Sequence, residues 1–216
     1  MSKKNIFGSI LSIFSTNVFV MVLVAAAGII LPRLLSPQAL GRLNSLTALA
    51  AIVYSFAFLG MRSSLVMHLG KKKFEEQQIL SATVYIFILS SLLSTLAILF
   101  FFFFLSKDEY PLLIVLLVCL INPLEFLISY MQGHNLALAR YGNFNRLKWL
   151  PRLIYLLAIL LLVGTLGWNI RGALMAIILS TLMTIVIYMV SRGMARQALK
   201  KGDIPLQVIR SLLGYG

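Results

Sequence analysis

The chain has 216 residues, of which 60% are hydrophobic and only 12% are charged, with a mean hydropathy of +0.96. This balance leaves too little polar surface for a soluble globular domain and indicates a membrane protein with several spans. The formal charge of +13 would suit nucleic acid, but the basic residues lie in short clusters between apolar runs. There they set topology and contact anionic headgroups, so we expect membrane lipids and no nucleic acid as partners.

Six apolar runs have the length of transmembrane helices and are separated by short polar connections. They cover residues 10–31, 43–59, 79–105, 112–131, 150–166 and 172–190. We therefore predict an all-α, polytopic membrane protein, with a six-helix transmembrane bundle over residues 1–190 and a basic tail over residues 191–216. The first run continues past Ala27 to Leu31, beyond the apolar region of a cleavable signal peptide, so we interpret it as a retained signal anchor.

The basic residues predict the orientation of the six spans. Of the 19 Lys and Arg residues, all fall on one side except four, which are Arg33, Arg42, Lys107 and Arg171. Because Lys and Arg gather on the cytoplasmic side of membrane proteins, both termini are expected in the cytoplasm. Every connection keeps this imbalance, which supports the number of spans.

The first two spans each carry small and polar residues on one helical face, spaced three or four positions apart. These are Ser9, Ser12, Thr16 and Asn17 in the first span, and Asn44, Thr47, Ala51 and Ser55 in the second. Such faces indicate close helix packing with hydrogen bonds between helices. They could equally line a polar cavity, and the two interpretations are compatible.

Glu125 is the only carboxylate inside a predicted span. A charge in the middle of a bilayer costs about 2.5–3.5 kcal/mol on insertion scales, so this side chain should face protein or water. It is a candidate for proton or cation coupling, or for pairing with a basic residue that contacts the substrate, and the alternative is structural pairing with a neighbouring helix. Arg33, Arg42 and Arg62 lie at span ends, where they are either topogenic, snorkelling residues or ligands of a substrate.

Residues for catalysis are not evident. The chain has no Gly-rich phosphate loop, no HExxH motif, no nucleophile elbow and no acid pair with metal-ligand spacing, so we predict a non-enzyme without catalytic residues, metal or cofactor. Cys119 lies inside an apolar run and is expected to be a small buried side chain. The block Phe100–Phe104 is expected to face lipid. His68 and His134 are placed in loops and given no role.

A loose motif joins the first two spans. After the apolar first helix come a turn like the Arg-x-Leu-x-x-Pro type but one residue shorter, a glycine, a helix rich in small residues and a closing glycine. The residues are Arg33, Leu35, Pro37, Gly41 and Gly60, followed by Arg62. Later segments, YGNF and the turn around Gly167 and Gly172, fit the same pattern. Over nearly its whole length the chain resembles polysaccharide and O-antigen flippases, of the multidrug, oligosaccharidyl-lipid and polysaccharide exporter superfamily.

The resemblance implies translocation of a lipid-linked oligosaccharide or polysaccharide precursor across a bacterial plasma membrane by alternating access. Members have two six-helix halves, so we expect this chain to be the N-terminal half, as a truncated product. The substrate would carry a polyprenyl diphosphate. Its candidate ligands are Arg33, Arg42, Arg62, Asn17 and Asn44, with Glu125 for coupling. Two alternatives are a cation-coupled multidrug exporter half and a non-transporting scaffold subunit of a glycan-assembly complex, and partners would be the second half or glycan-assembly proteins.

Overall fold

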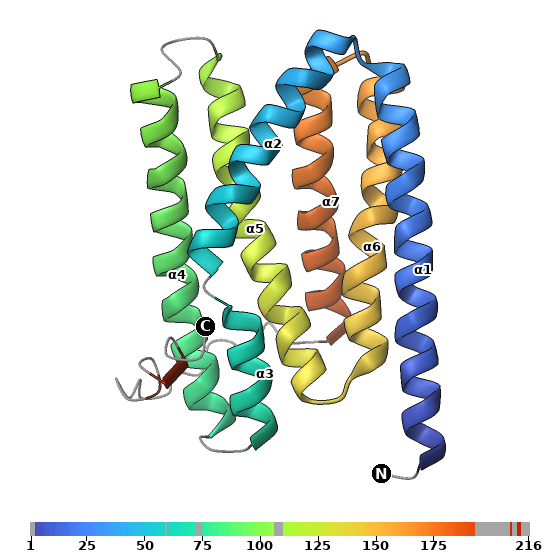
Figure 1. Cartoon of the computed structure of the whole chain (residues 1–216), viewed down its shortest axis with the longest axis vertical. Helices are drawn as coiled ribbons and strands as arrows, with labels where there is room; N and C mark the ends of the chain where they lie inside the picture. The colour runs from blue at the N-terminus through green and yellow to red at the C-terminus, as the bar shows by residue number, and fades with distance from the viewer. Residues whose placement is uncertain are drawn as a thin grey trace.

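A computed structural model describes residues 3–58, 60–71, 75–105, 110–192, 208 and 211–212. Within these residues the chain is helical and contains no strand, and the helices lie side by side in one bundle (Figure 1). The helices are α1 (Lys3–Leu34), α2 (Pro37–Phe58), α3 (Met61–Lys71), α4 (Glu76–Phe100), α5 (Leu112–Ala137), α6 (Tyr141–Ile159) and α7 (Asn169–Arg192). Two π-helical stretches, η1 (Phe101–Leu105) and η2 (Leu160–Thr165), continue α4 and α6.

Six stretches of the described helices are long and apolar enough to cross a membrane, which confirms the all-α, polytopic prediction. They are Ile10–Leu34, Pro37–Gly70, Glu76–Phe104, Leu112–Ala137, Tyr141–Thr165 and Asn169–Ser191. Of the predicted tail, residues 191–192, 208 and 211–212 are described, and the other positions lie outside the described residues.

The second span is broken, and its lower part is α3. Gly60 adopts a left-handed backbone with φ of +63°, and its carbonyl oxygen accepts from the backbone N–H of Ser63 at 2.9 Å. The segment from Met61 was expected to be a polar connection, but it is helical to Lys71. The reason is an apolar face with a period of four, because Met61, Leu65 and Leu69 are all buried.

The fifth membrane helix begins at Tyr141 rather than at Leu150. Hydropathy alone suggested a late start, because this turn-rich, basic sequence lowers the local average. The first turns of α6 nevertheless bury Phe144 and Leu147 against the bundle. Lys148 was expected in the connection, and Arg152 was counted among its basic residues although it falls within the predicted run 150–166. Both lie inside a membrane-spanning helix.

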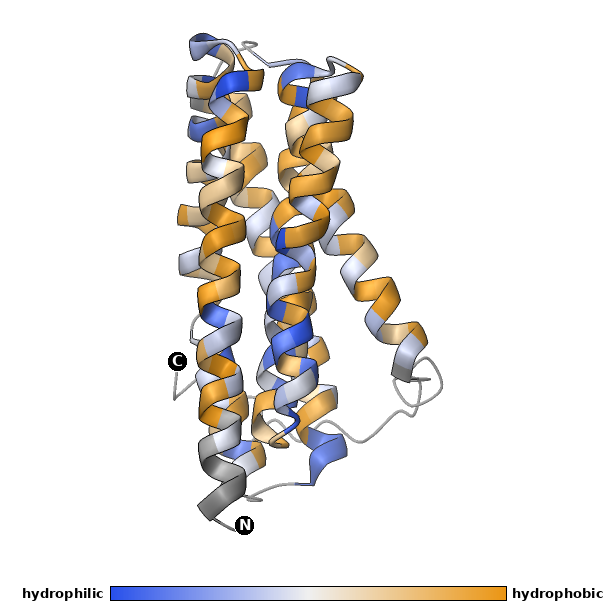
Figure 2. Ribbon diagram, turned by 90° about the vertical axis from the view of Figure 1, so that its right-hand side faces the viewer, coloured by the Kyte–Doolittle hydropathy of each residue, from blue (hydrophilic) through white to orange (hydrophobic). Residues whose placement is uncertain are grey.

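Two apolar clusters hold the described helices together. One joins α1, α2, α4, α5, α6 and α7, and the other joins the end of α2 to α3, α4 and α5. The outer surface of α1 exposes apolar side chains such as Phe14 and Met21, as expected against lipid. In Figure 2 hydrophobic residues dominate the helix surfaces, while hydrophilic residues lie at helix ends and in a column along the middle of the bundle.

The phenylalanine block is only partly exposed, and both histidines lie on helices. Cys119 is buried, and Phe103 and Phe104 are exposed, but Phe102 is buried against the ring of Tyr110, with ring centroids 5.6 Å apart. The two histidines are not in loops. Each lies on a helix with a buried side chain, His68 on α3 and His134 on α5, because each ring finds hydrogen-bond partners there; His134 Nε2 is 3.1 Å from Glu76 Oε1.

Candidate functional site

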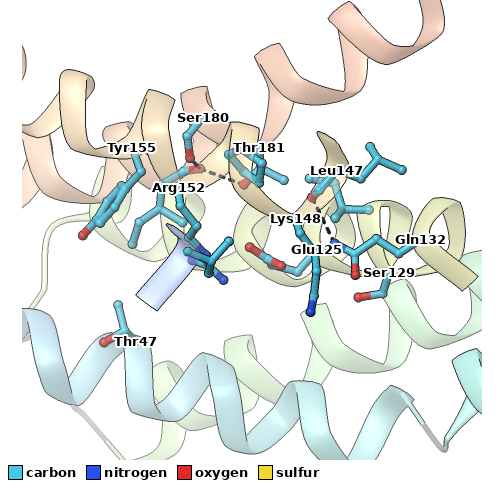
Figure 3. A pocket seen from close by; sticks show the side chains of 14 residues that line it. Thr47, Glu125, Ser129, Gln132, Leu147, Lys148, Arg152, Tyr155, Ser180 and Thr181 are labelled. Carbon is cyan, nitrogen blue, oxygen red and sulfur yellow. Dashed lines mark hydrogen bonds between the residues drawn. The ribbon is translucent and has the colours of Figure 1, made fainter. Parts of the chain in front are cut away.

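A polar cavity of about 470 Å³ lies among α1, α2, α5, α6 and α7 (Figure 3). Its lining residues are Val20, Thr47, Glu125, Ile128, Ser129, Gln132, Leu147, Lys148, Pro151, Arg152, Tyr155, Ile177, Ser180 and Thr181. Glu125, Arg152 and Ser180 each lie near the middle of their span. The cavity is therefore at the depth where the bilayer is most apolar, which makes its polar lining expensive to maintain.

Three charged groups face this cavity. Lys148 and Arg152 come from α6, one helical turn apart, and Glu125 comes from α5. Figure 3 shows the Glu125 carboxylate in the cavity together with the ends of both basic side chains. Within the described part of the chain, neither cation forms an ion pair with Glu125, since the only pair within 4.0 Å joins His134 and Glu76. The charges of the cavity are therefore not neutralised by ion pairs with one another.

Hydroxyl groups complete the lining. Ser180 and Thr181 of α7 donate to the carbonyl oxygen of Ile177 at 2.8 and 2.9 Å, and Thr47 of α2 donates to that of Leu43 at 2.9 Å. Each donation uses the hydroxyl proton on the helix's own backbone. The oxygen lone pairs remain as acceptors, which suits a ligand that carries its own hydroxyl groups.

A second basic group lies beside the cavity, around the ring of Phe144. Lys148 Nζ lies 5.4 Å and Arg62 Cζ lies 5.3 Å from the centroid of this ring, both within cation–π range. Lys148 Nζ also donates to Asn17 Oδ1 at 2.6 Å. Arg62 belongs to α3, so the break in the second span brings this guanidinium next to α6 and near the edge of the cavity.

The seam between α1 and α6 is polar. Besides the Lys148–Asn17 bond, Asn145 Nδ2 donates to Ser12 Oγ at 2.9 Å. The polar face predicted on the first span is thus used for hydrogen bonds between helices. On the second span, Thr47 lines the cavity, so both interpretations of the polar faces apply, each to a different helix.

The structure brings together half of the predicted site residues. Glu125 lines the cavity, Asn17 holds Lys148, and Arg62 shares the Phe144 ring with Lys148. Arg33, Arg42 and Asn44 do not line the cavity. All three are exposed, and the two arginines lie near the α1–α2 turn at the upper end of the bundle (Figure 1).

Sequence reasoning missed Lys148, Arg152 and the hydroxyls of α7. A signal was present on α6, because Asn145, Lys148, Arg152 and Tyr155 recur at helical spacing on one face. Because the predicted span began at Leu150, Asn145 and Lys148 counted as loop residues, and the pattern was not recognised.

Metal-ligating groups do not gather in the described residues, where no cluster of three or more His, Cys, Asp or Glu side chains occurs. The cavity offers instead two cations, one carboxylate and several hydroxyl acceptors. No protein-family model, curated protein or solved structure matches this chain.

Proposed function

We propose that this protein takes part in moving a lipid-linked oligosaccharide or polysaccharide precursor across the bacterial plasma membrane. The observation that supports this proposal is the cavity lined by Lys148, Arg152 and Glu125, the last two of which lie near the middle of their spans. Ionisable residues inside a membrane usually serve a substrate or ion pathway, because their insertion is costly. The charge balance favours an anionic ligand.

The chemistry of a polyprenyl diphosphate-linked glycan fits the lining. The Arg152 guanidinium presents a planar fork that can bind two phosphate oxygens at once, and Lys148 adds a point charge. Sugar hydroxyls can donate to the oxygens of Ser180 and Thr181, which remain as acceptors. The polyprenyl chain would stay in lipid, outside the cavity.

A second bundle would complete such a transporter. Arg152 is exposed at mid-depth although its helix crosses the membrane, and α1 and α2 diverge below their turn (Figure 1). A charged side chain that lipid can reach at this depth needs a protein or water-filled cover. We therefore propose that this bundle acts as the N-terminal half beside a second six-helix half, with both termini cytoplasmic.

The test is binding of farnesyl diphosphate, a short polyprenyl diphosphate, to the purified full chain in nanodiscs. Arg152→Gln should weaken binding about tenfold or more, the loss expected for one charge-assisted contact of about 1.4 kcal/mol. Arg171→Gln is the matched control, because Arg171 is an exposed arginine at the start of α7 outside the cavity. Equal binding by both variants would contradict the proposal.

Glu125 favours one alternative, a cation-coupled drug exporter. A carboxylate in a membrane cavity can bind a proton or a cationic drug. Lys148 and Arg152 would repel such a drug, so we rank this function second. Saturable binding of ethidium, abolished by Glu125→Gln, would favour it. A scaffold subunit without transport would bind neither ethidium nor farnesyl diphosphate in the cavity.

A further inference from the structure

Three residues far beyond α7 in the sequence are described against α3. Val208 is 1% exposed and Leu212 is completely buried. They belong to the apolar cluster of α3, α4 and α5, where they pack together with side chains such as Leu65 and Ile79. This cluster lies below the break in the second span, so the chain after α7 supplies part of the core around α3.

Two polar contacts fasten the same residues to one face of α3. Ser64 Oγ donates to the carbonyl oxygen of Leu212 at 2.7 Å, and His68 Nε2 is 2.8 Å from Ser211 Oγ. His68 Nδ1 is 2.8 Å from the carbonyl oxygen of Ser64, which can only accept, so Nδ1 carries a proton. Ser64 and His68 are one turn apart, and together they hold Ser211 and Leu212 on α3.

The helix that receives these contacts also carries Arg62. α3 has only 11 residues and is separated from α2 by Gly60, so its position depends on packing rather than on helix propensity. Its first turn is closely fitted, because a Cβ at Gly133 of α5 would lie 3.3 Å from Arg62 Cγ. Whatever stabilises α3 therefore also places Arg62 beside Phe144.

We propose that Val208, Ser211 and Leu212 act as a docked strap that holds α3, and with it Arg62, at the edge of the polar cavity. Release of the strap uncovers Leu65 and Ser64 and lets α3 move, which withdraws Arg62 from Phe144. The docking itself is independent of what the cavity binds. Its effect on an anion in the cavity rests on the proposed function.

Thiol labelling of the full chain tests the docking. In a Cys119→Ala background, Ser64→Cys places a thiol at a position that is 1% exposed, and its S–H keeps a weak donor for the Leu212 carbonyl oxygen. Ser63→Cys, one residue earlier, is exposed. With the strap docked, a maleimide should label position 63 fast and position 64 slowly. Leu212→Asp should accelerate labelling at position 64 about tenfold or more, since protection follows burial, and leave position 63 unchanged.

His68→Ala removes one polar contact of the strap without changing the strap itself, so it should accelerate labelling at position 64 by a smaller factor than Leu212→Asp does. Labelling at position 64 that is fast before any strap substitution, or unchanged by both substitutions, would overturn the docking. A variant that aggregates is recognised by size-exclusion chromatography, and the other variant then decides.

Binding of farnesyl diphosphate tests the effect on Arg62. Leu212→Asp should weaken binding as much as Arg62→Gln does, and the double variant should show no further loss, because both remove the same cation. Unchanged affinity in Leu212→Asp, with position 64 labelled fast, would overturn the control of Arg62. No binding by the unsubstituted protein would count against the proposed function, while labelling would still decide the docking.

Discussion

Arg152 is the charged side chain that bears most directly on the proposed function. It lies near the middle of the α6 span, exposed, without a carboxylate within ion-pair distance among the described residues. A charge in that position costs about 2.5–3.5 kcal/mol on insertion scales, which packing alone does not offset. A substrate or a second bundle that contacts Arg152 would offset it, which is why the proposed function places the diphosphate there.

The geometry of the guanidinium predicts what a conservative change does. Arg152→Lys keeps the charge but loses the fork that can bind two oxygens of one phosphate, so farnesyl diphosphate binding should weaken about tenfold, or about 1.4 kcal/mol. Arg33→Lys should leave binding unchanged, since Arg33 is an exposed residue outside the cavity. Calorimetric titration of both variants checks this. A loss of similar size in Arg33→Lys would return the binding site to the α1–α2 turn.

Glu125 lines the same cavity, where its negative charge would repel an anionic ligand. Glu125→Gln removes a negative charge but keeps the volume, so diphosphate affinity at neutral pH should rise about tenfold as the repulsion between like charges is lost. The ratio of the two affinities should approach one as the pH falls, because protonation neutralises the carboxylate of the unsubstituted protein, whereas protonation of the diphosphate affects both proteins alike. Affinity profiles that are parallel in the two proteins would show that Glu125 is structural.

Glu125 could be predicted as a site residue from the sequence and Arg152 could not, for a physical reason. A lone acid in a long apolar run stands out, since nothing else in the run is charged. Arg152 follows Arg146 and Lys148 within one short stretch, which has the composition of a cytoplasmic connection. Only the packing of Phe144 and Leu147 shows that this stretch is helical and inside the bundle.

Among the elements, the break between α2 and α3 has the largest effect on the site. It turns the second span so that Arg62 approaches Phe144 on α6. The sequence predicted an end of the helix at Gly60 correctly, but it could not predict that α3 continues beyond it. The charges and histidine of that segment lowered its hydropathy, while its buried face of Met61, Leu65 and Leu69 was hidden in the average.

Gly60 should therefore be sensitive to substitution. Its φ of +63° lies in the left-handed region, which costs a residue with a Cβ about 1–2 kcal/mol, so Gly60→Ala should lower the midpoint of thermal unfolding in detergent. Gly41→Ala is the matched control, because Gly41 lies within α2 with open space around it, where alanine favours the helix. Equal effects of the two substitutions would contradict this account of the break.

The number of membrane helices follows from composition more directly than the residues of the cavity do. Six long apolar runs predict six helices whatever their contacts, because a backbone in lipid must satisfy its own hydrogen bonds. The packing of the helices depends on single residues, such as Asn135 Nδ2, which donates to the Tyr188 hydroxyl at 2.6 Å and joins α5 to α7. Such pairs are not readable from hydropathy, so the arrangement of the bundle was not predictable.

Orientation in the membrane remains a prediction of the basic residues, and two described turns allow a test. In a Cys119→Ala background, Ala139→Cys lies in the α5–α6 turn and Leu166→Cys in the α6–α7 turn, both at exposed positions. With cytoplasmic termini, an impermeant maleimide added to whole cells should label the second and not the first. The reverse pattern would invert the topology, and labelling of both would contradict the number of spans between them.

The proposed function requires that the cavity bind the diphosphate of a lipid-linked glycan, and photolabelling shows whether it does. A diazirine-bearing polyprenyl diphosphate should label residues of α6 around Lys148 and Arg152, with Arg152→Gln reducing the yield about tenfold, as for the loss of about 1.4 kcal/mol of binding. The corresponding polyprenol, which lacks the diphosphate, should label only the lipid-facing surface. Equal labelling of α6 by both probes, or a yield unaffected by Arg152→Gln, would contradict the account.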